Sequence, residues 1–173
     1  MFRNICIKDF KENVFDLVGN ESMLITAGGT NNHNTMTASW GFMGEMWGQE
    51  CVSIVVRPQR YTNEFLTENE YFTLCFFGKD ERAKEIYKLC GTTSGRDINK
   101  AKKLGLTVCG NEKVAYFDEA RMVIVCKKLY CAELKEENFV QKETAQKFYP
   151  QKDYHLQYIG SIERIYVKEN DEE

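Results

Sequence analysis

The residues with the clearest chemical potential form a short turn after an apolar run, Arg57-Pro58-Gln59-Arg60-Tyr61-Thr62. Two guanidinium groups accompany a proline that fixes the turn and a hydroxyl at the point where a helix is expected to begin. The first turn of a helix adds unpaired N–H groups and the positive end of the helix dipole, so this turn suits an anion such as a phosphate. The alternative is an ordinary helix start with solvated arginines, and spacing alone does not decide between the two.

A segment that carries a tryptophan lies upstream of this turn. It reads Asn34-Thr35-Met36-Thr37-Ala38-Ser39-Trp40-Gly41 and is separated from the arginine turn by one predicted hairpin. Small and hydroxylated residues before Trp40 allow a planar ring to approach the backbone, which together with the turn suits a ligand with a flat head and an anionic tail. Composition alone favours the other interpretation, a tryptophan buried in the core of a barrel.

Two further positions qualify by residue type. His155 follows Asp153 at the start of the last segment of alternating apolar residues. A lone histidine in a strand is more often a satisfied structural residue than a ligand, so both roles remain open for it. The tripeptide Ser94-Gly95-Arg96 resembles a second anion-binding loop, but a tripeptide is weak evidence.

The common dinucleotide, phosphate and nucleophile motifs are absent from the sequence. There is no Gly-x-Gly-x-x-Gly opening a helix, no Gly-x-x-x-x-Gly-Lys-Ser/Thr loop and no Gly-x-Ser-x-Gly elbow. A nicotinamide, if the protein uses one, is therefore not bound through the standard motif. The formal net charge of −3 and the lack of a basic block argue against nucleic acid, and no apolar run approaches the roughly 18 residues that cross a membrane.

The seven cysteines occur singly, mostly within apolar runs, and none forms a Cys-x-x-Cys pair. We expect reduced thiols that behave as small hydrophobic residues, which predicts a cytoplasmic protein. His33 and His155 lie far from any cysteine pair with zinc spacing, so no metal site is expected.

The apolar pattern predicts strands with short helices between them, in one domain spanning residues 1–173. Helices are expected at 62–69 with Thr62 as the N-cap, at 80–89 with Gly91 as terminator, at 99–104 before Gly105, and at 138–148. Because strands and helices do not alternate regularly, we expect a mainly β protein, an antiparallel barrel with peripheral helices. The expected strands cover residues 23–27, 35–47, 51–56, 71–77, 115–117, 122–134 and 155–162.

Five short segments, in this order and spacing, resemble the flavin reductase-like family, whose members include flavoredoxins. The resemblance extends from about Asn20 to Val167. It implies a six-stranded antiparallel Greek-key split barrel that binds FMN, usually as a homodimer with the cofactor near the subunit interface. The segments are Leu24-Ile25-Thr26-Ala27-Gly28, Asn34 to Gly41, Arg57 to Thr62, Ser94-Gly95-Arg96-Asp97, and Asp153-Tyr154-His155 with Ile159-Gly160.

The resemblance also implies the roles of individual residues. In such proteins the strand that ends in tryptophan lies along the isoalloxazine, and the turn after the next strand receives the phosphate. His155 would face the flavin as the catalytic residue, while Arg96 or Lys100 would place positive charge near the N1–C2 edge. The residues expected to bind FMN are Asn34, Thr35, Met36, Thr37, Ala38, Ser39, Trp40, Arg57, Arg60, Tyr61, Thr62, Ser94, Gly95, Arg96 and Lys100.

The implied activity is that of an FMN-dependent oxidoreductase. NADH or NADPH would deliver a hydride to flavin N5, and the reduced flavin would pass electrons to an acceptor. The absence of a dinucleotide motif favours an alternative, a flavoredoxin-type carrier that takes electrons from a redox partner protein and has no NAD(P)H oxidase activity of its own. A third interpretation is a binding protein without turnover, since related split barrels bind pyridoxal phosphate or haem, although the Trp40 strand favours FMN.

Overall fold

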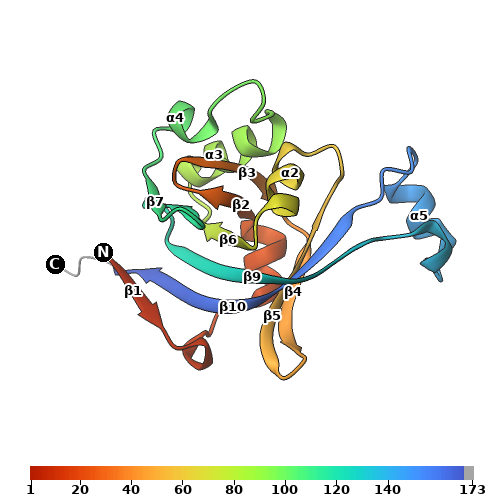
Figure 1. The fold of residues 1–173 in the computed structure, drawn as a ribbon, viewed down its shortest axis with the longest axis horizontal. Coiled ribbons are helices and arrows are strands. Elements are labelled where there is room, and N and C mark those ends of the chain that lie inside the picture. The colour runs from red at the N-terminus through yellow and green to blue at the C-terminus, as the bar shows by residue number, and fades with distance from the viewer. Residues whose placement is uncertain (170–173) are drawn as a thin grey trace.

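The computed structural model describes residues 1–169 (Figure 1). Its order of elements places most helices between strands of one large sheet. In chain order they are β1 (Phe2–Ile5), η1 (Ile7–Asp9), α1 (Val14–Asp16), η2 (Leu17–Glu21), β2 (Met23–Gly29), β3 (Asn32–Ala38), β4 (Gly41–Met46), β5 (Gln49–Val56), α2 (Tyr61–Glu68), β6 (Tyr71–Phe76), α3 (Glu81–Thr92), α4 (Lys100–Leu104), β7 (Val108–Gly110), β8 (Ala115–Phe117), β9 (Met122–Glu133), η3 (Glu136–Asn138), α5 (Lys142–Phe148) and β10 (Leu156–Lys168).

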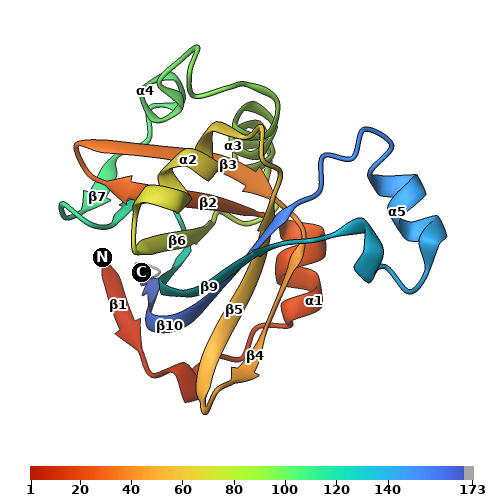
Figure 2. The ribbon, with the colours of Figure 1, turned by 45° about the vertical axis from the view of Figure 1, so that its right-hand side comes forward.

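The sheet is antiparallel throughout and curls into a barrel (Figures 1 and 2). Within residues 1–169 it contains eight strands, in the order β3-β2-β6-β9-β10-β5-β4, with β1 paired to the end of β10. β7 and β8 form a separate hairpin. The predicted fold class, a mainly β antiparallel barrel with peripheral helices, is confirmed, and the main sheet has two strands more than the six expected.

The central strands are buried on both faces, which explains their nearly continuous apolar sequences. In β2, Ile25 points into the barrel core, whereas its neighbour Leu24 joins a second core beneath α3 and α4. β9 alternates in the same way, with Ile124 inside the barrel and Val123 in the second core. Each face therefore excludes water, and the barrel wall at the middle of the sheet is rigidly packed.

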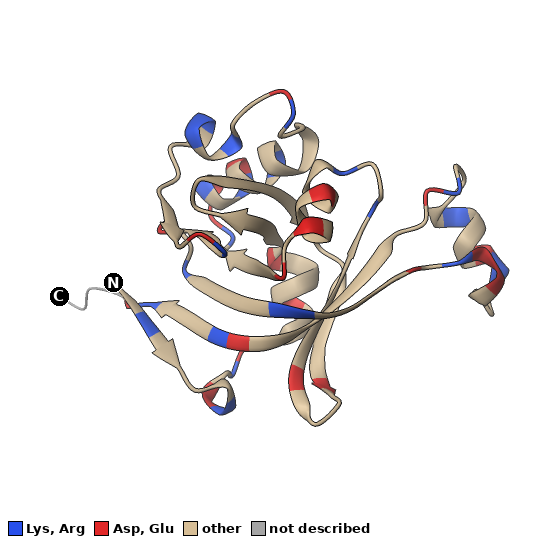
Figure 3. Cartoon of the chain, viewed as in Figure 1, with Lys and Arg blue, Asp and Glu red and all other residues tan. Residues whose placement is uncertain are grey.

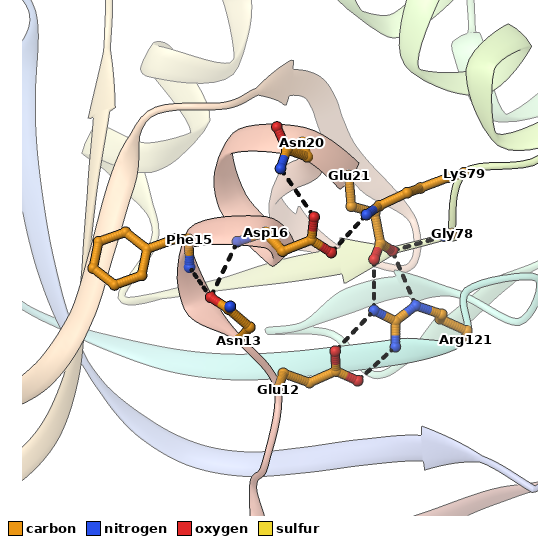
Figure 4. Close-up of polar contacts among 9 residues, drawn as sticks. All are labelled: Glu12, Asn13, Phe15, Asp16, Asn20, Glu21, Gly78, Lys79 and Arg121. Atoms are coloured by element: carbon orange, nitrogen blue, oxygen red, sulfur yellow. Dashed lines mark hydrogen bonds and ion pairs between the residues drawn. The ribbon is translucent and has the colours of Figure 1, made fainter.

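The segment before β2 is held by a charged network (Figure 4). Arg121 donates to the buried Glu21 through Nε at 3.0 Å and through its terminal nitrogen at 2.5 Å, and also to Glu12 at 2.8 Å. Glu21 additionally accepts from the Gly78 backbone at 2.7 Å. These carboxylates raise the pKa of the Arg121 guanidinium above its usual range. The network holds the segment that leads into Met23, the first residue of β2, which pairs with Ala38 at the end of β3.

The helices largely follow the predicted ranges, but α3 ends at a different residue from the one expected. Asp80 caps α3 through a bond from the Ala83 backbone at 2.7 Å, but the helix continues through Gly91 to Thr92. Gly91 is therefore not the terminator; a Cβ added there would contact Thr37 of β3, so its small size suits the packing of α3 on β3. The short helix α4 is as predicted, with Asn99 as N-cap and Gly105 in the left-handed conformation after it.

Between β9 and β10 the chain leaves the barrel as a projecting segment, residues 134–155, which we call the arm (Figures 1 and 2). The arm contains η3 and α5 and has its own small hydrophobic cluster of Ala145, Tyr149 and Tyr154, with Leu134 and Phe139 packed against it. The predicted helix at 138–148 is shorter, because α5 begins only at Lys142.

Candidate functional site

Most of the predicted site residues gather where β3 ends, between the β5–α2 turn, the α3–α4 loop and the arm. They line two cavities of about 180 and 240 Å³. Arg60 lines both cavities, so the two adjoin at its side chain. The smaller, which we call the anion cavity, is lined by Asn34, Gln59, Arg60, Tyr61, Thr62, Gly91, Thr92, Thr93, Ser94, Gly95 and Lys100. The larger, which we call the ring cavity, is lined by Met36, Thr37, Ala38, Ser39, Trp40, Val55, Arg57, Arg60 and His155.

The anion cavity contains two cations beside a helix N-terminus. Arg60 is the N-cap residue of α2, and no side chain caps the helix there. Its guanidinium makes one long hydrogen bond, 3.3 Å to the Cys90 carbonyl, and burial lowers the pKa of Arg60 below its ordinary value. An uncapped N-terminus leaves N–H groups and the positive dipole end available to an anion.

Lys100 is the second cation, and it is deeply buried, with 5% of its surface exposed. Its Nζ donates to the carbonyl of Thr35 at 2.7 Å and to that of Cys90 at 3.2 Å. Burial lowers the pKa of the Lys100 ammonium to about 8; the Cys90 thiol opposes this shift and the Arg60 cation adds to it. At neutral pH Lys100 is therefore still mostly charged, and one of its three donors remains for a ligand.

Asn34 lies between α2 and the α3–α4 loop, two segments that line this cavity. Its side-chain nitrogen donates to the Thr62 hydroxyl at 2.7 Å, and a Cβ on Gly95 would overlap the Asn34 side-chain oxygen. A side chain at position 95 would therefore require Asn34 to move and to lose its bond to Thr62. The predicted N-cap role of Thr62 is wrong, because α2 begins at Tyr61 and the Thr62 hydroxyl faces Asn34.

The ring cavity is an open slot with aromatic side chains at one end. Trp40, which is 43% exposed, lies 5.3 Å from the imidazole of His155 and edge-on to Phe148 at 5.4 Å between ring centroids. The end of β3 provides the slot's small residues, Thr37 to Ser39. The Thr37 hydroxyl donates to the Tyr87 carbonyl at 2.6 Å, which ties this strand to α3.

His155 is 7% exposed and lies immediately before β10. Its Nδ1 is 2.8 Å from the hydroxyl of Tyr149. Burial, with a smaller contribution from the Arg57 cation, lowers the pKa of the imidazole to about 4, although Asp153 opposes the shift. His155 is therefore neutral at pH 7 and can offer a hydrogen bond to a ligand but not a positive charge.

Three predicted residues do not present their polar groups to the cavities. Arg57 lines the ring cavity, but its guanidinium pairs with Asp153 and donates to the Phe148 carbonyl at 2.9 Å. Arg96 pairs with Glu64 and lies over the Tyr61 ring. The hydroxyl of Thr35 is buried in the barrel wall, 2.9 Å from that of Thr26. The structure thus leaves Arg60 and Lys100 as the cations of the anion cavity.

Several residues that line the cavities or contact a lining residue were not predicted. Gln59, Thr92 and Thr93 were within reach of the sequence, since they are neighbours of the predicted Arg60 and Ser94 and carry hydrogen-bonding groups. Tyr149 had no such signal, because its contact with His155 depends on how the arm folds back.

Three further observations concern residues 1–169 as a whole. Figure 3 shows Lys and Arg interspersed with Asp and Glu along the chain. Residues 1–169 hold no cluster of three or more His, Cys, Asp or Glu side chains arranged for a metal ion. Across the same residues, every helix is too short or too polar to cross a lipid bilayer.

Comparison with known proteins identifies relatives of this fold. The family model described as Flavin reductase like domain matches residues 16–173. Among solved structures, flavoredoxin from Methanosarcina acetivorans superposes with a TM-score of 0.65 at 19% identity, covering 93% of this chain and 76% of the other. Flavoredoxin of Desulfovibrio vulgaris (Miyazaki F) gives 0.65 at 18% identity, covering 95% and 78%.

A third structure is named as an enzyme. The NADH:FAD oxidoreductase SgcE6 of Streptomyces globisporus C-1027 superposes with a TM-score of 0.63 at 12% identity, covering 86% of this chain and 75% of the other. A comparison with curated protein sequences gave no match. At these identities the structural likenesses show a shared fold.

Proposed function

The chain belongs to the flavin reductase-like family, and from that premise we propose that it is an FMN-binding flavoprotein. The observation that carries the proposal is the junction of the two cavities at Arg60. One cavity contains two buried or half-buried cations at an uncapped helix N-terminus, and the other is a slot between a strand of small residues and aromatic rings. A phosphate and a flat ring joined by a chain are the ligand parts that this pair accommodates.

The residues present fit the two ends of FMN. Arg60 and Lys100, with the hydroxyl of Ser94 and the N–H groups at the start of α2, would hold the phosphate. The isoalloxazine would lie along Thr37 to Trp40, with His155 at its edge. When bound, FMN supplies the redox chemistry, accepting a hydride and passing electrons on.

The protein's own residues would bind and orient the cofactor. Trp40 lies at one end of the slot, with its ring packed edge-on against Phe148. His155 would donate or accept one hydrogen bond as a neutral imidazole. The buried Lys100 would place positive charge next to β3, because its Nζ donates a hydrogen bond to the carbonyl of Thr35 on that strand. No covalent nucleophile is needed for this chemistry.

For the activity, we propose reduction of FMN by NADH or NADPH, followed by electron transfer to an acceptor. The name of the Streptomyces structure, an NADH:FAD oxidoreductase, supports this choice. The alternative, a flavoredoxin-type carrier that receives electrons from a redox partner protein, is favoured by the two flavoredoxin structures and by the absence of a dinucleotide motif.

Stopped-flow mixing of the FMN-loaded protein with NADH or NADPH under anaerobic conditions separates these functions. Bleaching of the flavin absorbance within seconds is the result expected for a reductase, and the faster donor is the preferred one. Bleaching that requires an added electron-transfer partner would instead establish the carrier.

We also propose that the protein is a homodimer. Phe42 and Trp47 of the β4–β5 hairpin and Tyr130 of β9 are exposed, and the rings of Trp47 and Tyr130 lie 6.4 Å apart. β4 is an edge strand, so apolar side chains and unpaired backbone groups occur together on this surface. Sedimentation analysis is expected to give a dimer that Trp47→Glu dissociates, whereas a monomer at all concentrations would contradict the proposal.

A cytoplasmic location is proposed from the cysteines. All seven are free thiols, and four of them, Cys51, Cys75, Cys90 and Cys126, are buried. Burial raises the pKa of the Cys75 thiol to about 12, so it remains protonated and unreactive. Free thiols persist in a reducing compartment. Fractionation of cells that express the protein tests this location.

Two ligands that differ only in the phosphate group test whether Arg60 binds the phosphate of FMN. We expect Arg60→Ala to weaken FMN binding by about 1.5–3 kcal/mol, because a charge-assisted hydrogen bond is lost. Binding of riboflavin, which has no phosphate, should change little. Quenching of flavin fluorescence measures both affinities.

The control variant is Arg82→Ala on α3, whose arginine pairs with the exposed Glu85 away from both cavities. Equal losses for FMN and riboflavin in Arg60→Ala would mean that Arg60 contacts the ring rather than the phosphate. A purified protein that shows no flavin spectrum after FMN is added would refute the proposed function altogether.

A further inference from the structure

The hydrogen bond between Tyr149 and His155 determines which nitrogen of the imidazole faces the ring cavity. The Tyr149 hydroxyl lies 2.8 Å from Nδ1 of His155, and both residues are buried. The imidazole is neutral at pH 7, so it carries one hydrogen, on either Nδ1 or Nε2. The partner of Nδ1 therefore decides what Nε2 offers to a ligand.

Two arrangements of hydrogens are compatible with this distance. In the first, the phenol donates to Nδ1 and Nε2 carries the hydrogen; in the second, Nδ1 donates to the phenol oxygen. Within residues 1–169 the Tyr149 hydroxyl has no other hydrogen-bond partner, so in the second arrangement its own hydrogen would be buried without an acceptor. Burial also raises the pKa of Tyr149, which keeps the phenol protonated. The first arrangement gives the buried phenol hydrogen an acceptor and leaves only the Nε2 hydrogen free for a ligand.

Nε2 of His155 is open to the cavity. Among residues 1–169, no fully buried side-chain nitrogen or oxygen lacks a hydrogen-bond partner, and Nε2 makes no hydrogen bond in the structure. It must therefore be accessible, and His155 is a lining residue of the ring cavity. The Trp40 ring on one side and Tyr149 on the other restrict rotation of the imidazole.

Tyr149 is itself held in place. Its ring stacks on Tyr154 with centroids 4.7 Å apart, inside the hydrophobic cluster of the arm. The Arg57 guanidinium lies 5.2 Å from the ring centroid and is anchored by the Phe148 carbonyl and by Asp153. The backbone of His155 is fixed as well, since its carbonyl accepts from the Leu134 amide at 2.9 Å.

We propose that Tyr149 is a positioning residue, whose hydroxyl holds His155 in the Nε2–H tautomer and so presents an N–H donor to the ring cavity. The matching ligand group is a hydrogen-bond acceptor, a carbonyl oxygen or an aromatic ring nitrogen. That this acceptor belongs to FMN or to the carboxamide of a nicotinamide donor rests on the proposed function.

Nitrogen NMR of protein labelled with 15N in its histidine rings tests the tautomer in the ligand-free protein. The chain has only two histidines, so His155→Gln assigns both. His33 provides an internal reference of the opposite kind, because its Nδ1 lies 3.2 Å from the Gly29 carbonyl, which can only accept. We expect a protonated Nε2 for His155 and a protonated Nδ1 for His33 at neutral pH.

The role of Tyr149 is tested by removing one oxygen atom. Tyr149→Phe is expected to convert the His155 signals to a mixture of tautomers and leave those of His33 unchanged. Tyr154→Phe is the matched control, since Tyr154 belongs to the same cluster and its hydroxyl makes no hydrogen bond to His155. A wild-type His155 protonated on Nδ1, or a tautomer unchanged in folded Tyr149→Phe, would overturn the proposal.

Ligands then identify the acceptor. A shift of the Nε2–H signal on addition of FMN alone assigns the acceptor to the flavin, and a shift that appears only when NAD⁺ is added to the FMN-loaded protein assigns it to the nicotinamide. If visible spectra show bound FMN and neither addition moves the signal, the donor role is refuted. If FMN does not bind at all, the proposed function fails, while the ligand-free spectra still decide the role of Tyr149.

Discussion

The anion cavity and the ring cavity each contain one buried basic side chain, and the two differ in charge at pH 7 although burial lowers both pKa values. Burial lowers the pKa of Lys100 to about 8 and that of His155 to about 4. Because an ordinary lysine titrates near 10.5 and an ordinary histidine near 6.5, Lys100 remains a cation at pH 7 and His155 becomes neutral. Because the two side chains start from different ordinary pKa values, burial leaves a charge at one end of the site and an uncharged hydrogen-bonding group at the other.

The largest expected effect is on the pH dependence of stability and comes from His155, the side chain that is neutral at pH 7. The pKa of His155 is depressed on folding, so its contribution to stability is complete above pH 6.5 and is lost as the pH falls towards 4. The loss amounts to roughly 3 kcal/mol. Urea unfolding between pH 7 and 4 should therefore show a steeper loss of stability for the wild type than for His155→Gln.

Other groups titrate in the same range, and the variant separates them from His155. Asp153 and Arg57 are the charged groups beside the imidazole and are present in both proteins. Parallel stability curves for the wild type and His155→Gln would show that folding leaves the pKa of His155 unshifted, which would contradict the effect of burial inferred for the ring cavity.

The next largest effect is on FMN affinity and comes from the Lys100 cation. Lys100→Met should weaken FMN binding at pH 7 by about 2–3 kcal/mol, because a charged donor to the phosphate is removed. Lys102→Met is the control, since Lys102 lies on the same short helix and is exposed. Titrations with FMN and with riboflavin give the difference. Equal affinity for FMN in the two variants would exclude Lys100 from the phosphate site.

A smaller effect is expected from raising the pH on the wild type. Since Lys100 loses its proton above about pH 8 in the free protein and a bound anion favours the charged form, FMN affinity should fall by up to ~1.4 kcal/mol per pH unit above that value. The Cys90 thiol beside it has a pKa raised to about 11 by burial and stays neutral over most of this range. Fluorescence titrations at pH 7 to 9.5 measure the slope, and Lys100→Met should be flat.

The smallest effect is expected at Arg96. Its guanidinium pairs with the exposed Glu64 and lies over Tyr61, so Arg96→Ala should change FMN affinity by about 0.5 kcal/mol or less. Calorimetric titration with FMN resolves this change. A loss as large as that of Lys100→Met would mean that Arg96 leaves Glu64 and contacts the cofactor, as the family resemblance implies.

Local signals in the sequence were sufficient for the strands and for part of the site. Nearly continuous apolar runs located β2, β5, β6 and β9, because these strands are largely buried on both faces. Asn99 and Gly105 marked the two ends of α4 correctly, because the cap contacts of this helix are made with residues of the helix itself. The segments Asn34–Trp40 and Arg60–Thr62 lie together because the end of β3 adjoins the β5–α2 turn at Arg60.

What the sequence could not show depends on contacts between distant segments. Arg57 and Arg60 look equivalent in sequence, yet Arg57 is bound by Asp153 and Phe148, 91 or more positions away. Thr62 looked like a cap and instead accepts a hydrogen bond from Asn34. The charge state of His155 follows from its burial against Trp40 and Tyr149, which no local pattern encodes.

The separate hydrophobic cluster of the arm has a consequence for how the protein loses structure. Ala145, Tyr149 and Tyr154 are not part of either barrel core, and the arm is joined to the β5–α2 turn through Arg57 and Gln59. Regions with their own contacts can open at a free energy below that of global unfolding. Amide hydrogen exchange should therefore report two opening energies, a lower one for the arm and a higher one for β2, β6 and β9. Thermal denaturation reports mainly the unfolding of β2, β6 and β9. A single melting temperature would therefore not describe the opening of the arm, which holds Tyr149 against His155.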